Sequence, residues 1–466
     1  MKRKEENKEI ATHQDIDFEV VFLELRNALN NDDYDLFREE FLKLHTYEQS
    51  EFFLTLNVEE RENLYHFLSP REVGDFFDSF ELETEEYESF LNEMDSRYAA
   101  QVVGSMQYDN AVDILNELPK DMVATFLPLM NREDREEIRS LMNYEEDTAG
   151  GIMTTEFVSI DSDMTVRQSM EYLKEVAPNS ETIYYIFVTD PSNKLAGIIS
   201  LRDLIVAEDD EYIGDIMKER VISVRAADDQ EEVANKMRDY DFLAVPVIDY
   251  QNHLVGIITA DDIMDVIHEE AEEDYYRLAG MSEQESPINS TAVESAKKRL
   301  PWLIGLTFMG MITATMLSTF EETLEKVAIL GAFIPIIGGM AGNAGTQSLA
   351  VAVRGLSTGE IREASLGKLA IKDIVTGMLT GVVCGVLLFG IISILFGQPM
   401  LGVIVSISLF VAMTVATLSG TFIPMGMQKI GIDPAVASGP FITTSNDIIS
   451  LVIYFSLANA LMSALI

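Results

Sequence analysis

Five long apolar stretches in the last third of the chain constrain the fold more than any other feature. They lie at about residues 301–320, 327–353, 374–396, 400–428 and 436–465. About 20 apolar residues of helix cross the hydrocarbon core of a bilayer, so each stretch is long enough to span one. Because no water satisfies the backbone inside a membrane, the stretches predict five transmembrane helices and a lipid bilayer as a partner.

The charged residues divide at the same point of the chain. Residues 1–299 contain 27 Lys and Arg against 70 Asp and Glu, whereas residues 300–466 contain 6 against 8. The first part has a formal net charge of −43 and is predicted to be a strongly acidic soluble region. Cations are its natural partners. Nucleic acid is excluded as a partner because phosphate binding depends on Lys and Arg.

Basic residues around the apolar stretches predict the orientation in the membrane. Lys326 falls on one side of the five predicted spans, and eight basic residues fall on the other: Lys297, Lys298, Arg299, Arg354, Arg362, Lys368, Lys372 and Lys429. The positive-inside rule then places residues 1–299 in the cytosol and the C-terminus outside the cell membrane. A polar start, MKRKEENKEI, and a single cysteine, Cys384, also fit a reduced cytosolic setting for the acidic region.

Residues 16–148, after a flexible start at residues 1–15, show a short repeat. Apolar residues recur every 12 positions, with one step of 14, at Leu44, Leu56, Leu68, Leu82, Met94, Met106, Leu118, Met130 and Met142. Residues suited to capping a helix follow several of these positions, as Asn57, Ser69 and Asp95 do. The pattern predicts an all-α superhelical domain built from a stack of short helices.

Residues 149–268 contain a duplicated β-α-β-β-α pattern, with copies at residues 149–212 and 213–268. The copies close on the similar segments GIISLRD, at 197–203, and GIITADD, at 256–262. The pattern resembles a pair of CBS modules. A hydroxyl at a helix start followed by Asp suits a ribose and a phosphate. The resemblance implies an adenine nucleotide such as ATP near Tyr185, Arg202, Asp203, Phe242 and Pro246. A purely structural role for the pair stays open.

Two features of the apolar region indicate more than an anchor. The second stretch reads PIIGGMAGNAGTQ at residues 335–347, where glycines and Asn343, Thr346 and Gln347 replace larger apolar residues. Small residues allow helices to approach closely, and polar ones suit a water-filled path. Asp447 is the only Asp, Glu, Lys, Arg or His in the last stretch, and an acid within a membrane is a functional candidate. Both features favour an ion path through the membrane.

The acidic segment DIMDVIHEEAEEDYYRLAG and the basic ESAKKRL join the two parts, and residues 269–299 are predicted to form a connecting helix. With the repeats and both membrane motifs, this order of segments resembles the MgtE magnesium channels over residues 15–466. The resemblance implies a multidomain homodimer: an N-terminal all-α superhelical domain, an α/β tandem CBS pair, a connecting plug helix and a five-helix transmembrane domain at residues 300–466. It also implies a central path that cytosolic Mg²⁺ closes by bridging the acidic domains and connecting helices.

Site residues follow from the resemblance position by position. Asp447 matches the pore carboxylate, with Asn343 as a helper, and Asp433 matches an acid near the cytosolic mouth. The implied Mg²⁺-sensing acids are Asp109, Asp113, Asp229, Asp241, Asp262, Asp265, Glu270 and Glu273. Oxygen ligands of this kind suit Mg²⁺, which sheds water reluctantly.

Other functions stay open or are disfavoured. The sequence does not rank Mg²⁺ against Mn²⁺, Co²⁺ or Ni²⁺, nor a channel against a carrier. A membrane-anchored CBS nucleotide sensor without transport is the alternative from another class, although it would not need Asp447. An enzyme is not expected, because Asp433 and Asp447 lie 14 residues apart. That separation is roughly 21 Å along a continuous helix, too far for a catalytic pair of carboxylates.

Overall fold

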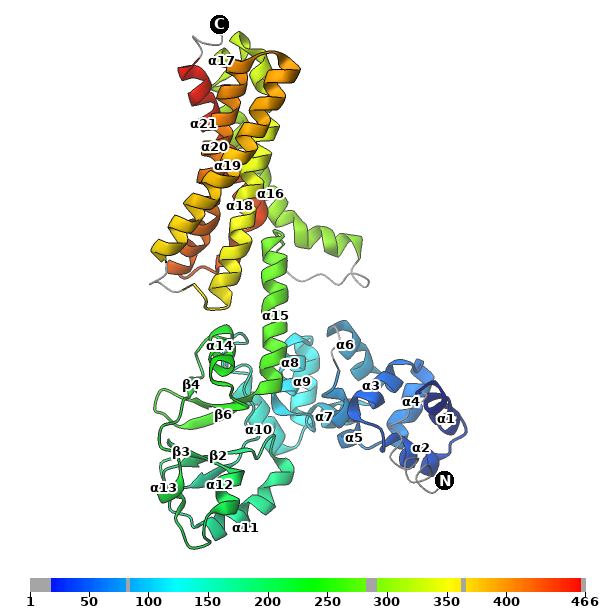
Figure 1. Ribbon diagram of the computed structural model, residues 1–466. Helices are drawn as coiled ribbons and strands as arrows, with labels where there is room; N and C mark the ends of the chain where they lie inside the picture. The colour runs from blue at the N-terminus through cyan, green and yellow to red at the C-terminus, as the bar shows by residue number, and fades with distance from the viewer. Residues whose placement is uncertain (1–17, 81–83, 282–290, 362–365, 462–466) are drawn as a thin grey trace, which may run out of the picture. The chain divides into compact units, whose positions relative to one another are not determined.

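The computed structural model describes residues 18–80, 84–281, 291–361 and 366–461. The predicted flexible residues 1–15 lie outside this set. The chain divides into two compact units, Met1–Ile263 and Met264–Ile466. The first unit holds short helices followed by two small sheets, and the second holds a bundle of long helices (Figure 1).

Short helices build the N-terminal part of the first unit. Their bounds are α1 Phe18–Asn30, α2 Tyr34–Phe41, α3 Thr46–Leu54, α4 Val58–Phe67, α5 Pro70–Phe77, α6 Thr84–Glu93, α7 Ser96–Val103, α8 Tyr108–Glu117, α9 Lys120–Phe126, η2 Leu127–Leu129 and α10 Arg132–Leu141. From α2 onward the α-helices begin every 12 residues, except for a step of 14 between α5 and α6, as the apolar repeat predicts. Asn57 and Ser69 form capping boxes at α4 and α5, whereas Asn131 makes no side-chain cap bond at α10.

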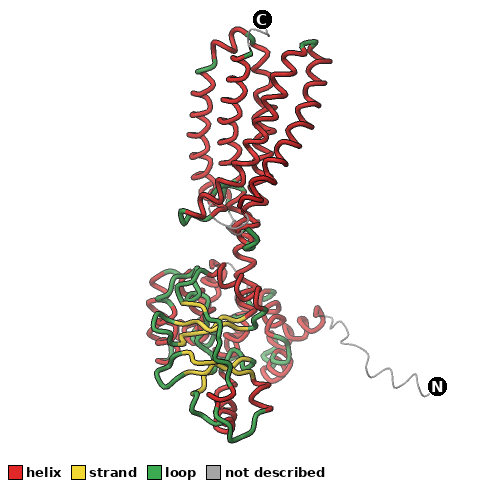
Figure 2. Tube along the Cα trace, turned by 60° about the vertical axis from the view of Figure 1, so that its left-hand side comes forward, coloured by secondary structure: helices red, strands yellow, loops and turns green. Residues whose placement is uncertain are grey.

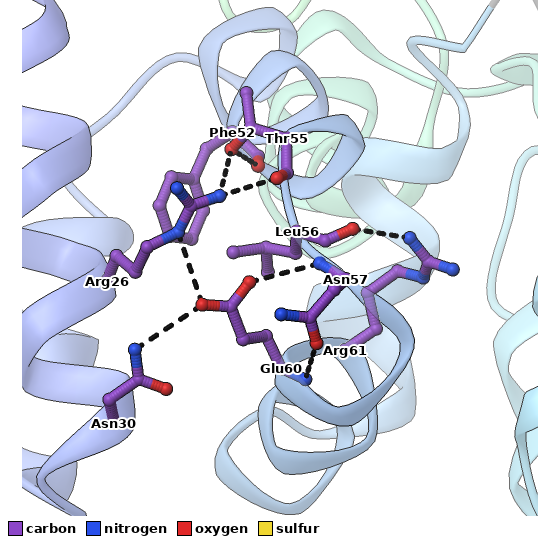
Figure 3. A network of polar contacts seen from close by, with 8 residues as sticks. All are labelled: Arg26, Asn30, Phe52, Thr55, Leu56, Asn57, Glu60 and Arg61. Carbon is purple, nitrogen blue, oxygen red and sulfur yellow. Dashed lines mark hydrogen bonds and ion pairs between the residues drawn. The ribbon is translucent and has the colours of Figure 1, made fainter.

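Contacts between distant repeats hold the stack together. Arg26 pairs with Glu60, Arg38 with Glu72 and Arg61 with Glu93, so each pair joins residues 32 to 34 positions apart. Figure 3 shows the first pair, in which the Glu60 side chain also accepts from Asn30 and from the backbone of Asn57, the residue that caps α4. A buried aromatic core centred on Phe53 fills the space between the helices. These repeated contacts give the predicted superhelical stack.

Two three-stranded sheets follow in the first unit (yellow in Figure 2). The strands are β1 Ser159–Asp161, β2 Tyr185–Thr189, β3 Leu195–Ser200, β4 Val224–Arg225, β5 Ala244–Ile248 and β6 Leu254–Thr259. The helices and turns are α11 Val166–Val176, η3 Ala177–Asn179, α12 Leu201–Val206, α13 Ile213–Ile216 and α14 Gln230–Tyr240. In both sheets the first pair of strands is parallel and the second antiparallel. The predicted duplication is therefore present in the topology.

The connecting helix differs from its predicted bounds. Helix α15 spans Ala260–Leu278, so it begins directly after β6 and ends well before residue 299. Asp261 and Asp262 in its first turn favour this early start, because acids stabilise a helix N-terminus. The basic segment ESAKKRL belongs instead to α16, Ala292–Ser318, which starts at a capping box formed by Thr291 and Glu294.

The remaining elements of the second unit are mainly long helices. They are α17 Glu321–Lys326, η4 Ala328–Phe333, α18 Ile334–Ser357, α19 Leu366–Phe396, α20 Pro399–Lys429, η6 Pro434–Val436 and α21 Gly439–Ala460. Among the described residues, five helices are long and apolar enough to cross a membrane, which confirms the five predicted spans. Helices α18, α20 and α21 pack closely because Gly345 and Gly420 meet: a Cβ on Gly420 would lie 2.2 Å from the carbonyl oxygen of Gly345.

Candidate functional site

Glycines of the PIIGGMAGNAGTQ segment bring α18 against α21. A Cβ built on Gly338 would lie 2.7 Å from Oδ1 of Asp447, and one on Gly342 would lie 2.8 Å from Cγ2 of Thr443. Both distances are shorter than real Cβ contacts, so a larger residue at either position would displace the neighbouring side chain of α21. The motif therefore makes room for polar side chains of α21 inside the apolar part of the chain.

Asp447 lies at this helix junction. Its side chain is partly buried, and its carboxylate covers the backbone of Gly338. One helical turn away, the hydroxyls of Thr346 and Thr443 lie 3.2 Å apart, one on each helix. The junction thus combines one carboxylate with hydroxyl oxygens, and it is formed by the second and fifth of the long apolar helices.

Asn446, next to Asp447, has a packing role. Its side chain is 1% exposed, and its Oδ1 accepts a hydrogen bond of 2.8 Å from the hydroxyl of Ser419 on α20. A Cβ on Gly345 would lie 2.1 Å from its Nδ2. Asn446 therefore fastens α21 to α18 and α20, and this position keeps the direction of the neighbouring Asp447 fixed.

Asn343 lies on a different face of α18. Together with Gln347 it lines a cavity of about 390 Å³ between α18, α19 and α20, a cavity whose lining does not include Asp447. In the described part of the chain, no hydrogen bond joins Asn343 to Asp447. A single chain therefore does not bring these two predicted pore residues together.

Asp433 is held at the end of the connecting helix. It forms an ion pair with Arg277 of α15, and it caps η6 by accepting a hydrogen bond of 2.8 Å from the backbone of Ala435. Arg277 also pairs with Glu273, one of the predicted sensor acids. Nearby, the Ser357 hydroxyl of α18 donates to Asp274 at 2.7 Å. The last turn of α15 is thus fastened to the membrane helices, and Asp433 already has a cationic partner in this conformation.

The structure brings several predicted sensor acids of the first unit close together. Asp109 of α8 is 9% exposed. Burial raises its pKa well above the usual range, and the nearby charges of Asp262, Asp113 and Glu181 raise that pKa further. Within the described ranges, no three acids already stand in the geometry of a metal site. The cluster fits a cation by its charge, because a cation would relieve the repulsion among the acids.

Three acids that the sequence did not single out lie at the same domain contact. Burial raises the pKa of Asp78 to about 7, although Asn110 and Gln107 donate hydrogen bonds that lower it. Burial and the charges of Asp262 and Asp261 likewise raise the pKa of Glu181 to about 7. Asp78 lines a cavity of about 410 Å³ with Glu156. One signal was available: Asp78 ends α5, where the single 14-residue step interrupts the repeat.

The other predicted sensor acids have different positions. Asp229 caps α14 by accepting from the backbone of Glu231 and Glu232, and Asp241 ends that helix in a left-handed conformation, with φ of 53°. The structure thus gives both residues local roles at the ends of one helix. Asp265, Glu270 and Glu273 lie along α15, with Asp265 exposed and the other two partly buried.

The nucleotide residues lie at corresponding ends of the two sheets. The Ser200 hydroxyl donates to Asp203 at 2.7 Å, and Thr259 donates to Asp262 at 2.5 Å, so the closing segments of both copies have the same geometry. Tyr185 pairs with Ser200 across β2 and β3, which places it near Arg202 and Asp203 at the start of α12. In the second copy, Phe242 stacks on Tyr240 with ring centroids 5.4 Å apart, and Pro246 is buried in β5.

Comparisons with known proteins cover the whole domain order. The family model of the MgtE divalent cation transporters matches residues 334–457, the MgtE intracellular N domain matches 44–147, and CBS domains match 149–210 and 213–269. The magnesium transporter MgtE of Enterococcus faecalis is 49% identical over 446 residues, which cover 96% of this chain and 98% of that one. The chain belongs to the MgtE family. This membership, with its five apolar helices, makes it a multi-pass membrane protein.

Two solved structures each match about half of this chain. The soluble part of a magnesium transporter is 52% identical with a TM-score of 0.54, and the match covers 55% of this chain and 100% of that one. The cytosolic domain of the Mg²⁺ channel MgtE, solved in complex with ATP, is 35% identical with a TM-score of 0.49 and covers 53% of this chain and 99% of that one. The predicted order of an MgtE N domain, a CBS pair and five long apolar helices is confirmed.

Proposed function

We propose that the protein is a Mg²⁺-selective channel or transporter that imports Mg²⁺ across the cytoplasmic membrane. The position of Asp447 carries the proposal: its carboxylate lies against Gly338, where the glycine-rich face of α18 meets α21. Similarity to a magnesium transporter over nearly the whole chain supports the choice of ion. A carboxylate inside a membrane costs free energy, so such a residue typically marks an ion or a proton path.

The ligand chemistry at Asp447 suits a hydrated divalent cation. Mg²⁺ gives up its water reluctantly and is usually bound through one or two carboxylates while it keeps several waters. Asp447 supplies the carboxylate, and the hydroxyls of Thr346 and Thr443 can accept hydrogen bonds from the retained waters. No histidine occurs after His268, so imidazole ligands that would favour softer metals are missing from the path.

The path is proposed to lie on the two-fold axis of a homodimer. A two-fold axis would place one Asp447 from each chain on the same path, which gives a divalent ion two carboxylates. The predicted help from Asn343 then requires the partner chain, because within one chain Asn343 lies away from Gly338. The positive-inside distribution of Lys and Arg places the acidic domains in the cytosol and the C-terminus outside.

Cytosolic Mg²⁺ is proposed to close this path. Asp109, Asp262 and Glu181 repel one another within the first unit, and a bound divalent ion would stabilise their close approach. Ions at the acids of α15, namely Asp265, Glu270 and Glu273, would act on the same connecting helix whose last turn holds Asp433 through Arg277. Feedback of this kind requires that Mg²⁺ binds the closed state more tightly than the open one.

The CBS pair is proposed to bind an adenine nucleotide such as ATP. Ser200 caps α12 and orients Asp203, which can accept hydrogen bonds from ribose hydroxyls. Tyr185 and Arg202 flank this position, and Phe242 with Pro246 supplies the apolar counterpart in the second copy. No enzymatic activity is proposed, because the acids singled out above are proposed to serve the ion path and its Mg²⁺ sensor.

Uptake by sealed liposomes tests the proposed function. The purified protein is reconstituted around a Mg²⁺-sensitive dye, and external Mg²⁺ should enter only when the protein is present. Mg²⁺ supplied beforehand on the side of the acidic domains should slow uptake, whereas Na⁺ at the same ionic strength should not, since screening depends on ionic strength. Protein that binds Mg²⁺ but moves none would favour the membrane-anchored sensor, and equal uptake of Mn²⁺, Co²⁺ or Ni²⁺ would favour a broader divalent cation transporter.

A further inference from the structure

A second buried carboxylate lies in the membrane domain, away from Asp447. Asp373 of α19 is 8% exposed, and its carboxylate accepts a hydrogen bond of 2.6 Å from the hydroxyl of Thr421 on α20. It precedes the predicted third apolar stretch by one residue, yet it lies inside helix α19, which is long enough to span the membrane. An acid at such a position is a functional candidate by default.

Asp373 lines the cavity of about 390 Å³ between α18, α19 and α20. The other walls carry polar oxygens on all three helices, including Gln347, Thr376, Thr417 and Thr421. Thr417 and Thr421 are buried, with exposed fractions of 3% and 2%. The hydroxyls of Thr376 and Thr417 donate to the backbone of their own helices, so toward the cavity their oxygens can act as acceptors for water.

The cavity is separated from Asp447 along the helix that both positions share. Asp447 packs on Gly338, whereas Gly420, which precedes Thr421, packs on Gly345. Seven residues of α-helix separate Gly338 from Gly345, which is roughly 10 Å along the axis. The two acids also contact different partners, α21 in one case and α19 with α20 in the other. They therefore mark two positions at different depths of one membrane domain.

We propose that this cavity is a second site for a hydrated divalent cation, built around Asp373. The proposal rests on the proposed Mg²⁺ transport and adds a binding site on the α19–α20 side of α18. Six waters around the ion would occupy about 180 Å³ at ~30 Å³ each, so a hydrated ion fits the cavity. One carboxylate with hydroxyl and amide acceptors for the retained waters is a ligand set that Mg²⁺ accepts.

Two features could oppose a cation here. Lys372 also lines the cavity, but its side chain is exposed, and a long Lys stem can carry its ammonium away to a polar interface. The bond from Thr421 could also serve only to tie α19 to α20. Asp373→Asn separates these roles, because an amide oxygen still accepts from Thr421 while the negative charge is removed.

A thiol one helical turn from Asp373 reports on this site. Cys384, the single cysteine of the sequence, lines the same cavity but lies 11 residues from Asp373 along α19, which is roughly 16 Å. The reporter is therefore Thr376→Cys in a Cys384→Ser background, because Thr376 is exposed and lines the cavity three residues from Asp373. The rate at which a small methanethiosulfonate reagent modifies the introduced thiol is measured on the full-length protein in liposomes, with and without Mg²⁺ at constant ionic strength. At a Mg²⁺ concentration ten times the dissociation constant, occupancy should slow the reaction about tenfold. Asp373→Asn should abolish this protection.

Two control variants keep the protection specific to the cavity. Asp447→Asn should retain it, because that acid belongs to α21 and does not line the cavity. The triple variant Asp265→Ala, Glu270→Ala and Glu273→Ala should also retain it, since these residues lie on α15. Full protection in Asp373→Asn would overturn the proposal. Loss of protection in the triple variant alone would also overturn the proposal, because the thiol would then report gating. Equal protection by Na⁺ at the same ionic strength would overturn it as well.

A second measurement covers a reporter thiol that reacts too slowly to follow. The Mg²⁺ concentration that half-saturates uptake should rise several-fold in Asp373→Asn, while the matched Thr414→Val, on the same helix as Thr421 but outside the cavity lining, should behave as wild type. An unchanged half-saturation in a properly assembled Asp373→Asn would refute the site. Liposomes of the reporter protein that take up no Mg²⁺, yet show a protected thiol, would instead refute transport and leave the site standing.

Discussion

Replacing Gly338 by Ala should impair ion transport while leaving the fold intact. The added Cβ would lie 2.7 Å from Oδ1 of Asp447. Carbon and oxygen atoms in weak hydrogen-bonding contact stay about 3.3 Å apart or more, so the carboxylate must move by roughly 0.6 Å. Because that atom ends a flexible side chain, the helix can accept the change. Ala is also favoured over Gly inside a helix by about 1 kcal/mol.

The expected effect on transport follows from the displaced carboxylate. A hydrogen bond to a charged group contributes about 1.5–3 kcal/mol, so loss of one such contact with the hydrated ion predicts about a 10- to 100-fold fall in uptake at low Mg²⁺. The matched control is Gly339→Ala on the same helix, where no atom lies within 4 Å of the added Cβ. It should keep uptake near the wild-type rate.

Mg²⁺ uptake by liposomes, with dimer content measured by size-exclusion chromatography, separates the two variants. The argument fails if Gly338→Ala, properly assembled, transports as fast as wild type and Gly339→Ala. Equal losses in both variants would also contradict it, because they would indicate a general effect of Ala on the helix.

Three further predictions concern the gate and the CBS pair. Arg277→Gln removes a partly exposed ion pair with Asp433 that is worth about 1 kcal/mol, so half-inhibition of uptake should need several-fold more cytosolic Mg²⁺. The control Lys326→Gln removes an ion pair within α17 and should leave the inhibition unchanged. In the folded protein the pKa values of Asp78 and Glu181 are raised to about 7, so the stability that these two acids contribute to the first unit should be greatest at low pH and fall as pH rises from about 4 to about 7. Proteolysis without Mg²⁺ should therefore be faster at pH 8 than at pH 6, and Mg²⁺ should remove the difference. Calorimetry should detect ATP binding to the full-length protein, weakened by Arg202→Ala or Asp203→Ala; no heat at millimolar ATP would leave the CBS pair a structural role.

Features set by local periodicity could be predicted from the sequence. The 12-residue repeat fixes where successive short helices begin, because each cycle carries its own apolar anchor and cap. The five spans follow from composition, since a bilayer demands about 20 apolar residues whatever the packing. The glycines of α18 could be recognised as a close-packing motif, but only the structure shows that Gly338 is the one beneath Asp447.

Features that depend on distant contacts could not be predicted in this way. Glu181 becomes part of the acidic cluster only because the CBS pair folds against α8, more than 60 residues earlier in the chain. Asp373 falls at the edge of an apolar stretch, where hydropathy cannot tell an interfacial acid from a buried one. The face on which Asn343 lies depends on the rotation of α18 against its neighbours, which polar residue types alone do not determine.

The most direct test of the central claim is Mg²⁺ uptake by liposomes that contain Asp447→Ala at a verified dimer content. The proposed path places one carboxylate per chain against Gly338, so removing it should abolish uptake or reduce it severely, with a smaller loss for Asp433→Ala, whose carboxylate is paired with Arg277. Wild-type uptake by a properly assembled Asp447→Ala dimer would contradict the account.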